Sequence, residues 1–306
     1  MNRNPWAHRL ALALTLWSGC MVSSAVLAQE ANYPSADAAS TAFVKALRDN
    51  DKAALAKVLG ADWKDYIPTE GIDRDDVDLF LKRYDESHRI DSADGATHLV
   101  VGSENWVLPL PLAQDKEGWH FDLKKGAEEI RIRRIGANEL ATEQAMLAYY
   151  DAQREYATQD RDGDNVLQYA QKLRSSPGKQ DGLYWPVTGD QPPSPLGERF
   201  VGQEPKGPDF HGYRYRILTS QGASAPGGAY NYIVGGRMTS GFALVAWPSE
   251  YGETGVMTFI VSQSGDVYEK DLGPETSAKA AAITLFDPDK SWEKADMVSS
   301  PGEPAK

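Results

Sequence analysis

The chain has a single cysteine, Cys20, and no stretch of about 18 uninterrupted apolar residues. We expect Cys20 to be removed with an N-terminal signal or to be lipidated, so the mature chain would hold no free thiol. Disulfides, zinc thiolates and a cysteine nucleophile are then excluded for it. The shortness of the apolar runs predicts a mature chain without a transmembrane segment.

The common catalytic signatures are also missing. The sequence has no G-x-S-x-G motif, no phosphate-binding Walker loop and no H-E-x-x-H pair. Four histidines remain after the expected signal, and they lie far apart in the sequence: His88, His98, His120 and His211. His98 and His120 both fall in predicted strands and could be neighbours. We interpret them as surface histidines rather than a metal pair.

Positive charge is scarce. The chain has 32 basic and 44 acidic residues, and removal of Arg3 and Arg9 with a signal leaves 30 against 44, a formal charge of −14. No basic stripe is present, so a nucleic-acid partner is not expected. The acidic balance is typical of a protein that stays soluble by its net charge.

The N-terminal segment 1–28 has the pattern of a secretory signal. Arg3 and Arg9 precede the apolar run 10–17, and small residues permit cleavage after Ala28. We therefore expect a periplasmic or secreted protein. An alternative is a lipid anchor on the envelope, because "SGC" before and at Cys20 resembles a bacterial lipobox, although Trp17 stands where leucine is usual.

Segment 29–136 predicts an α+β domain. Ser35 can cap a helix that starts near Asp37, Asp51 a second helix that ends at Gly60, and 73–90 has the spacing of a third. The β-rich runs that follow predict an antiparallel meander: "THLVVG", "NWVLPLPL", "GWHFDL" and "EEIRIRRIG". In the last run we expect Ile130 and Ile132 to face the core. Prolines 109 and 111 predict that "VLPLPL" is an edge strand.

Segment 137–295 predicts a second α+β domain. A long helix is expected over 138–160, with Leu140, Met146, Leu147, Tyr150 and Tyr156 along its apolar face. A short helix over 166–173 and a Pro/Gly-rich stretch over 175–208 follow. Up to five antiparallel strands then lie between 212 and 273, with Leu244, Phe259, Val261 and Val267 as core residues. Residues 296–306 are expected to form a disordered tail.

Several long motifs resemble one bacterial exported family. They are "FDLKKGAEEIRIRRIGANEL", "AQREYATQDRDGD", "DGLYWP", "SPLG", "HGYRYRILTSQGASAPGGAYNYIVGG" and "GFALVAWPSEYGETGVMTFIVSQSGDVYEKDLGPET". Together they look like the family called domain of unknown function 2950, over nearly the whole mature chain. This resemblance implies a periplasmic or envelope protein and implies no activity.

The C-terminal half has a second, weaker resemblance. A long helix followed by a Gly-rich antiparallel sheet is similar to the globular heads of type IV pilins and pseudopilins. Pilins carry a hydrophobic half-helix directly after a prepilin cleavage site, whereas the helix here begins near residue 138 and is amphipathic. The resemblance therefore concerns the head alone and implies no assembly through a hydrophobic stem.

The best local motif for a ligand is "DRDGDNVLQYAQ", residues 160–171. Asp160, Asp162 and Asp164 occupy positions 1, 3 and 5 of an EF-hand-like loop, which gives three carboxylates for calcium. Asn165 stands in place of the usual glycine, and Gln171 in place of the closing glutamate. The alternative is an acidic loop that ends one helix and caps the next through Asp164.

A second candidate site combines aromatic and acidic residues near the C-terminal hairpins. Trp247, Tyr251 and Tyr268 could form a binding surface. Acids lie close to them in sequence, as a glycan cleft would need: Glu250, Glu253, Asp266, Glu269 and Asp271. The alternative is that Trp247 packs the sheet and the acids solvate its turns. The arginines of "RIRRIG" are interpreted as an intramolecular ion-pair row with Glu128, Glu129 and Glu139.

These observations favour an exported envelope protein with a non-enzymatic binding or assembly role. Its partner would be an envelope protein or a glycan. The alternative is a periplasmic hydrolase acting on glycan or peptide. The sequence implies no cofactor with certainty, and calcium is the one candidate.

Overall fold

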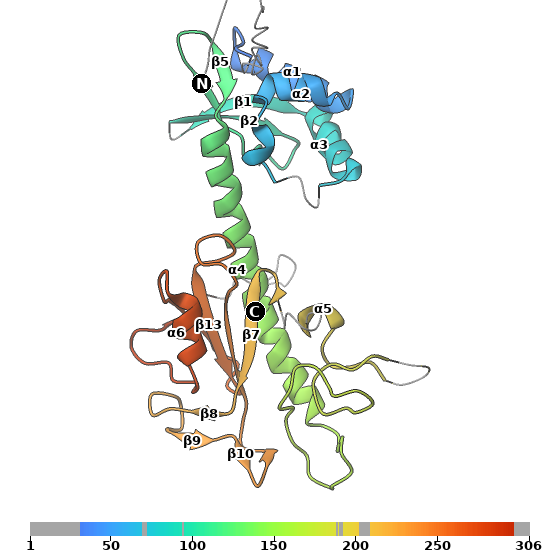
Figure 1. The fold of residues 1–306 in the computed structure, drawn as a ribbon, viewed down its shortest axis with the longest axis vertical. Helices are drawn as coiled ribbons and strands as arrows, with labels where there is room; N and C mark the ends of the chain where they lie inside the picture. The colour runs from blue at the N-terminus through green and yellow to red at the C-terminus, as the bar shows by residue number, and fades with distance from the viewer. Residues whose placement is uncertain are drawn as a thin grey trace, which may run out of the picture. The chain divides into compact units, whose positions relative to one another are not determined.

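The computed structural model describes residues 31–68, 72–93, 95–187, 189, 192–201 and 209–296. The expected signal, its Cys20 and most of the predicted tail lie outside these residues. The chain forms two compact units, residues 1–123 and 124–306. Each unit combines helices with antiparallel strands, so the α+β prediction is confirmed (Figure 1). Within the described residues, none of the helices combines the length and apolar character that crossing a membrane requires.

The first unit contains three α-helices, a single 3₁₀ turn and five short strands within its described residues. They are α1 (Ala36–Arg48), α2 (Lys52–Leu59), the turn Trp63–Asp65, α3 (Arg74–Glu86), β1 (His88–Ala93), β2 (Ala96–Val101), β3 (Trp106–Val107), β4 (Leu112–Gln114) and β5 (Trp119–Phe121). Side-chain caps set the helix starts. Ser35 accepts a hydrogen bond from the Ala38 amide, and Asp51 accepts from the Ala53 and Ala54 amides, as the sequence predicts.

The third helix is shorter than predicted. A capping box formed by Asp73 and Asp76 starts α3 at Arg74, and the helix ends at Glu86, so residues 88–90 belong to β1. Phe43 of α1 packs between the helices and the sheet of this unit. Its ring centroid lies 6.2 Å from that of Phe80 of α3 and 5.3 Å from that of Phe121 of β5. Aromatic packing between the helices and the sheet therefore forms the centre of the first core.

The prolines of "VLPLPL" interrupt the strand rather than marking an edge strand. β2 pairs with β1 on one side and with both β3 and β4 on the other. Pro109 and Pro111 lie between β3 and β4, outside the paired residues. Because proline lacks an N–H group, the ladder stops after the Leu108 amide, which donates to the Leu99 carbonyl at 2.9 Å, and it resumes at Leu112. The prediction of one edge strand over this segment is wrong for that reason.

The second unit contains one long helix, two short helices and ten strands within its described residues. They are α4 (Leu123–Tyr156, whose first residue falls in the first unit), α5 (Glu198–Val201), β6 (Asp209–Phe210), β7 (Tyr213–Leu218), β8 (Ser220–Gln221), β9 (Tyr230–Asn231), β10 (Ile233–Val234), β11 (Arg237–Met238), β12 (Ala243–Pro248), β13 (Met257–Ser262), β14 (Val267–Asp271), α6 (Thr276–Ala282) and β15 (Glu293–Lys294). Six of the strands form an antiparallel sheet in the order β15-β14-β13-β12-β7-β6.

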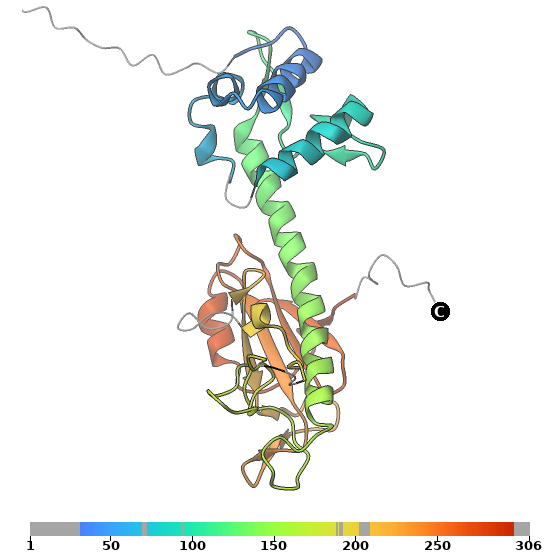
Figure 2. The same cartoon turned by 90° about the vertical axis from the view of Figure 1, so that its right-hand side faces the viewer.

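Helices cover both faces of this sheet. The C-terminal part of α4 lies on one face and α6 on the other, as Figure 2 shows. The α4 face carries Leu244, Phe259, Val261 and Val267, each no more than 1% exposed. Their burial confirms the predicted core residues. On the opposite face Arg216 donates hydrogen bonds to the carbonyls of Ala280, Ala281 and Ile283, and so fixes the end of α6.

The segment "EEIRIRRIG" is helical, so its prediction as a strand is wrong. It lies within α4, which begins 15 residues earlier than the sequence suggests, and Ile132 is 56% exposed instead of facing a core. The domain boundary expected at 136/137 therefore falls inside a helix. Leu140, expected on the apolar face, is 51% exposed, whereas Tyr149 is fully buried.

Contacts with the loop between β12 and β13 explain the early helix start. Arg131 donates to the Gly252 carbonyl at 2.9 Å, and Asn138 donates to the Thr254 carbonyl at 2.8 Å. Between them Arg134 contacts both the carbonyl and the carboxylate of Glu253. The three donors are spaced 3 and 4 residues apart, which places them on one side of a helix. Of the predicted ion pairs, Arg133–Glu129 forms within the helix at 3.4 Å, whereas Arg134 pairs with Glu253.

This reading of α4 predicts the effect of one substitution. Gly136 lies within the helix, and an added Cβ there meets nothing within 4 Å. We expect Gly136→Ala to stabilise the protein by about 0.5–1 kcal/mol, because alanine loses less backbone entropy than glycine in a helix interior. Denaturant unfolding monitored by circular dichroism measures the change. A loss of stability in Gly136→Ala would contradict a helix through this position.

Candidate functional site

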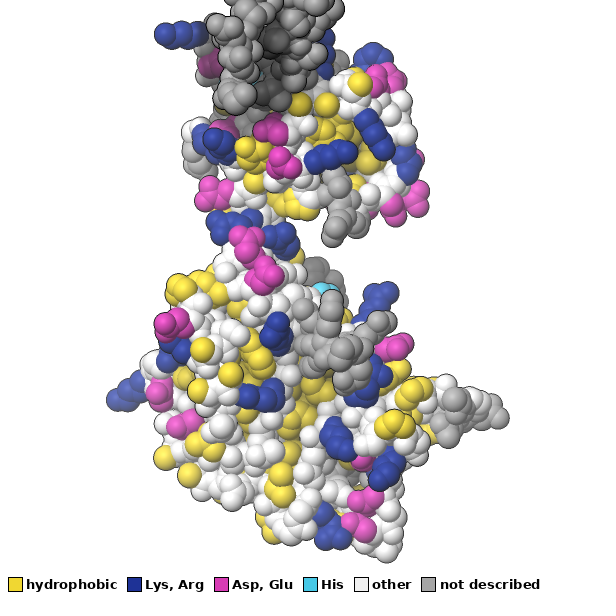
Figure 3. All heavy atoms as spheres, viewed as in Figure 1, with side chains coloured by type: hydrophobic (Ala, Val, Ile, Leu, Met, Phe, Trp, Pro, Cys, Tyr) yellow, Lys and Arg dark blue, Asp and Glu magenta, His cyan; other side chains and the backbone are white. Residues whose placement is uncertain are grey.

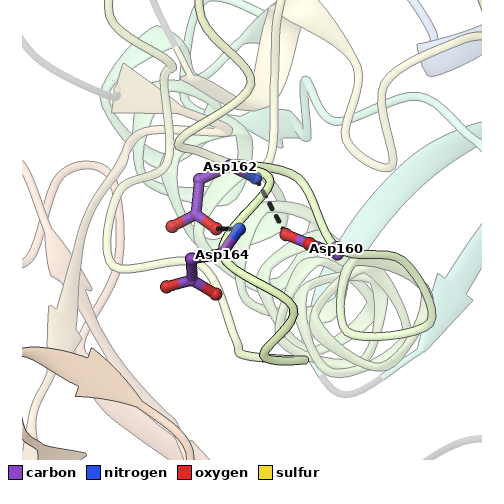
Figure 4. Close-up of side chains that lie close together, drawn as sticks. All are labelled: Asp160, Asp162 and Asp164. Atoms are coloured by element: carbon purple, nitrogen blue, oxygen red, sulfur yellow. Dashed lines mark hydrogen bonds between the residues drawn. The ribbon is translucent and has the colours of Figure 1, made fainter.

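The three aspartates of the predicted calcium loop converge. Asp160, Asp162 and Asp164 follow the end of α4, and each offers a carboxylate oxygen within 4.8 Å of the others (Figure 4). Asn165 adopts a left-handed backbone with φ of 64°, the conformation that the glycine of an EF-hand loop supplies. The spacing in the sequence therefore brings the three acids into one turn.

Internal hydrogen bonds already organise this turn. The Asp160 carboxylate accepts from the backbone amides of Asn165, Gly163 and Asp162, and these bonds lower its pKa. Asp164 accepts from the Val166 amide. The side chains thus act as local caps for a backbone that turns sharply.

Three further contacts differ from those of an EF-hand. Arg237 of β11 donates its Nε to Asp164 at 2.5 Å, and Gln168 donates its amide to Asp162 at 2.8 Å. Gln171, at the closing position, instead donates to the Gly236 carbonyl at 2.9 Å. Arg237 partly neutralises the acids and the Gln168 amide donates a hydrogen bond to them, and a bound cation would have to displace both donors.

The short helix predicted over residues 166–173 is absent, so Asp164 caps no following helix. Tyr169 instead bridges Met238 in an antiparallel pair. The buried Gln153 side chain of α4 replaces the helical hydrogen bonds at Ala170, donating to its carbonyl and accepting from its amide, both at 2.8 Å. A tertiary contact therefore fixes the backbone that the sequence pattern assigns to a helix.

Calcium binding by this loop stays a prediction, and titration calorimetry tests it. A site with three carboxylates and no closing glutamate is expected to bind with a Kd on the order of 10⁻⁴–10⁻³ M, as weak extracellular sites do. The heat should vanish in Asp162→Ala and persist in Asp266→Ala, an acid outside the loop that pairs with Lys294. Absence of both heat and a rise in melting temperature at millimolar calcium would contradict the prediction.

The predicted aromatic surface is distributed over two strands and a loop. Trp247 of β12 and Tyr268 of β14 lie on the α6 face of the sheet, with β13 between their strands. Trp247 is partly buried beneath the Arg216 guanidinium, 5.7 Å from its ring centroid. The Tyr268 ring centroid lies 6.0 Å from that of Phe286. Tyr251 follows β12 and donates its hydroxyl to Asp271 at 3.1 Å.

The acids near these aromatics are also divided. Glu253 pairs with Arg134 of α4 at 2.9 Å, and Asp266 pairs with Lys294 of β15 at 2.7 Å. Glu269 lies on the α4 face, opposite to Trp247. The structure therefore brings Tyr251 and Asp271 together, while Glu253 and Asp266 pair with other elements. A binding surface at Trp247, Tyr251 and Tyr268 stays a prediction.

The histidines show no common centre among the described residues. His120 approaches Asp115 at 3.7 Å, and the His98 ring approaches the Leu108 carbonyl at 3.2 Å. His88 stacks on Tyr84 with ring centroids 3.8 Å apart. His120 and His98 are paired with Ala113 and Asp91 in the strand register, not with each other. The register thus places His98 and His120 opposite other residues, and their interpretation as surface histidines stays a prediction.

A group of carboxylates between α4 and the sheet is the feature that sequence reasoning missed. Glu143 of α4 is 8% exposed, and its Oε2 finds no hydrogen-bond partner among the described residues. Burial raises its pKa to about 7, and the charges of Glu269 and Glu139 contribute to this shift. Burial also raises the pKa of Glu269, with further contributions from Glu139, Glu293 and Asp296.

Glu139 has a different environment from Glu143. Its Oε1 accepts hydrogen bonds from the amides of Val256 and Met257, at 2.8 and 3.0 Å, and from the Tyr213 hydroxyl at 3.5 Å. Burial, followed by the Glu139 charge, raises the Tyr213 pKa. Glu139 therefore anchors α4 to the start of β13, whereas the carboxyl of Glu143 has a raised pKa and no such donors.

Comparison with family models shows to which protein family the chain belongs. The model of the family described as Protein of unknown function (DUF2950) matches residues 30–295. The chain belongs to this family. The searches of the curated proteins and of the solved structures found no match. The family resemblance is thus confirmed, and the likeness of this DUF2950 chain to pilin heads stays a prediction.

A signal for the missed carboxylates is present in the DUF2950 sequence. Glu139 and Glu143 are four residues apart, and Met146 follows three residues after Glu143, so all three share one side of α4. Met146 is fully buried. Two glutamates in line with a buried methionine indicate carboxylates directed toward a core, a pattern that a search for metal or catalytic motifs does not detect.

Proposed function

We propose that this protein is an exported, non-enzymatic binding or assembly factor of the bacterial envelope. The separation of its perturbed acids from one depression in the surface supports this role. Glu143 and Glu269, whose pKa values are raised, lie between α4 and the sheet of the second unit. A depression of about 640 Å³ lies in the first unit, between α1 and α3. An active site combines such acids with a cleft, and here they occupy different units.

The depression has the character of a surface for polar contacts. Basic and acidic side chains alternate along it, joined by the Arg48–Asp85 and Arg74–Asp78 ion pairs at 2.6 and 2.7 Å. On the face shown in Figure 3, both signs of charge are interspersed over each unit. Exposed ion pairs contribute little to stability, so a partner could rearrange them at small cost. An envelope protein or a glycan is the proposed partner class.

Export and retention are tested by fractionation of cells that produce the full chain with a C-terminal tag. A periplasmic protein should appear in the soluble envelope fraction and a secreted protein in the medium, each with its first 28 residues removed. A lipid-anchored form should sediment with membranes and lose that behaviour in Cys20→Ser. Accumulation of the uncleaved chain in the cytoplasm would contradict export in both forms.

The alternative function is a periplasmic hydrolase of glycan or peptide. The contact between Tyr251 and Asp271 favours this candidate, because aromatic and carboxylate groups lie together in carbohydrate-active clefts. Product release separates the two functions. A hydrolase turns over its substrate, and replacement of its catalytic acid abolishes that turnover, whereas a binding factor forms a complex without new products.

A further inference from the structure

The last strand of the sheet, β15, meets an unusual electrostatic environment. Glu293 of β15 lies directly opposite Glu269 of β14 in the antiparallel register. Directly opposed residues project from the same face of a sheet, so two acidic side chains are neighbours here. Like charges at this position destabilise strand pairing. The edge of the sheet therefore carries a repulsive pair where a stable edge would carry opposite charges.

The neighbouring groups on this face are also acidic. Glu139 and Glu143 project from α4, and Asp296 follows β15. After burial, the charges of Glu269 and Glu139 raise the pKa of Glu143, and those of Glu139, Glu293 and Asp296 raise the pKa of Glu269. Tyr213 of β7 faces the same cluster through its contact with Glu139. The charged groups that shift these two carboxyls are all acids. Proton binding is therefore the means by which the cluster lowers its own repulsion.

Several contacts hold β15 in place against this repulsion. The Ala295 amide donates to the Val267 carbonyl at 3.0 Å, and Ala295 is 4% exposed. On the other face Lys294 pairs with Asp266 at 2.7 Å, and Lys270 donates to Ser291 at 2.6 Å. β15 has only two residues. Only these few contacts oppose the acidic repulsion, so a small change in charge is enough to detach the strand.

We propose that β15 is a pH-controlled edge strand, seated on β14 while Glu143 is protonated and detached when the ionised Glu143 adds its charge to the opposed Glu269 and Glu293 pair. Detachment leaves the outer edge of β14, Val267–Asp271, with unpaired backbone groups. Such an edge accepts an extended peptide strand. This device depends on the carboxylate geometry alone and not on the proposed envelope role.

Hydrogen exchange of the mature protein followed by mass spectrometry tests the device. Exchange is measured at about pH 6 and about pH 8, on either side of the Glu143 pKa, and is converted to protection factors to remove the intrinsic pH effect. The protection factors of residues 267–271 and 290–296 should be about tenfold lower at the higher pH than at the lower pH, while those of β12 and β13 stay unchanged. Equal protection at both values, or equal loss throughout the sheet, would overturn the proposal.

Two variants separate the device from general instability. Glu293→Lys places a cation opposite Glu269, so β15 should stay protected at both pH values. Glu143→Gln removes the buried titrating group and should reduce the pH-dependent loss at least by half. Glu275→Gln, an exposed acid beside α6, should behave as the wild type. A pH-dependent loss that is unchanged in Glu293→Lys would refute the mechanism, even where Glu143→Gln fails to fold.

Discussion

Substitution of Gly255 by alanine is expected to destabilise the protein by about 3–5 kcal/mol, because the added methyl group has no space. A Cβ at Gly255 would lie 2.1 Å from the Tyr213 hydroxyl oxygen and 2.5 Å from two ring carbons. Tyr213 is fully buried and donates its hydroxyl to the Met257 carbonyl at 3.0 Å. To accommodate the methyl group, the ring must leave its position against Phe259 and lose hydrogen bonds to Met257 and Glu139.

Denaturant unfolding of Gly255→Ala measures this effect. Gly197→Ala is the matched control, because an added Cβ there meets nothing within 4 Å and the backbone has no positive φ. The control should change the free energy of unfolding by less than about 0.5 kcal/mol. A change at Gly255 as small as that of the control would show that the Tyr213 packing is wrong. Further truncation to Tyr213→Phe in the same background should recover part of the lost stability, by removing the closest atom.

Glu143→Gln is expected to stabilise the protein by about 2 kcal/mol at about pH 8 and to have little effect below about pH 5. The folded-state pKa of Glu143, about 7, lies above its ordinary value of 4.5. The folded protein therefore binds this proton more tightly than the unfolded chain does. The stability that this proton provides is fully present below about pH 4.5 and is lost as pH rises toward about 7. Above about pH 7 the folded protein carries the full cost of an ionised, buried Glu143.

Thermal or denaturant unfolding across about pH 5–8 tests this dependence. The wild type should lose stability between pH 5 and 8 with a slope that Glu143→Gln flattens, whereas Glu275→Gln should leave the slope unchanged. Glutamine keeps the shape of the side chain without a group that ionises. Parallel slopes for the wild type and Glu143→Gln would show that Glu143 does not titrate in this range in the folded protein.

Local signals explain why much of the fold can be predicted from the sequence. Ser35 and Asp51 act through amides two or three residues away, so a short window contains the whole interaction. The strands β7, β12, β13 and β14 likewise alternate over their own length and end near turn residues. The confirmed elements are those whose stabilising contacts are local or repeat with a simple period.

The errors arise where distant residues decide the local structure. Ile130, Ile132 and Ile135 are β-branched and favour a strand, yet the contacts of Arg131, Arg134 and Asn138 with a loop more than 110 residues away stabilise a helix there. Residues 166–173 have a helical spacing, and Gln153 binds the backbone of Ala170 instead. Single-sequence periodicity does not contain these contacts.

The candidate sites also combine features that the local sequence predicts with features that depend on distant residues. The convergence of Asp160, Asp162 and Asp164 follows from their spacing, because one turn brings alternate residues together. The partner of Asp164, Arg237, is 73 residues away and is not visible in the loop sequence. The Glu143–Glu269 relationship requires the packing of α4 on β14, which the sequence does not specify. The surroundings of an acid, rather than its presence, determine its role here.

The central claim, that the protein binds an envelope component without chemistry, is tested most directly by incubating the purified mature protein with isolated bacterial envelopes. We predict that it sediments with the envelopes in a saturable manner and that no new soluble glycan or peptide fragment appears. Release of such fragments, with loss of that release in Asp271→Asn or Glu253→Gln, would contradict the claim and establish a hydrolase. Failure to sediment would equally contradict a binding role in the envelope.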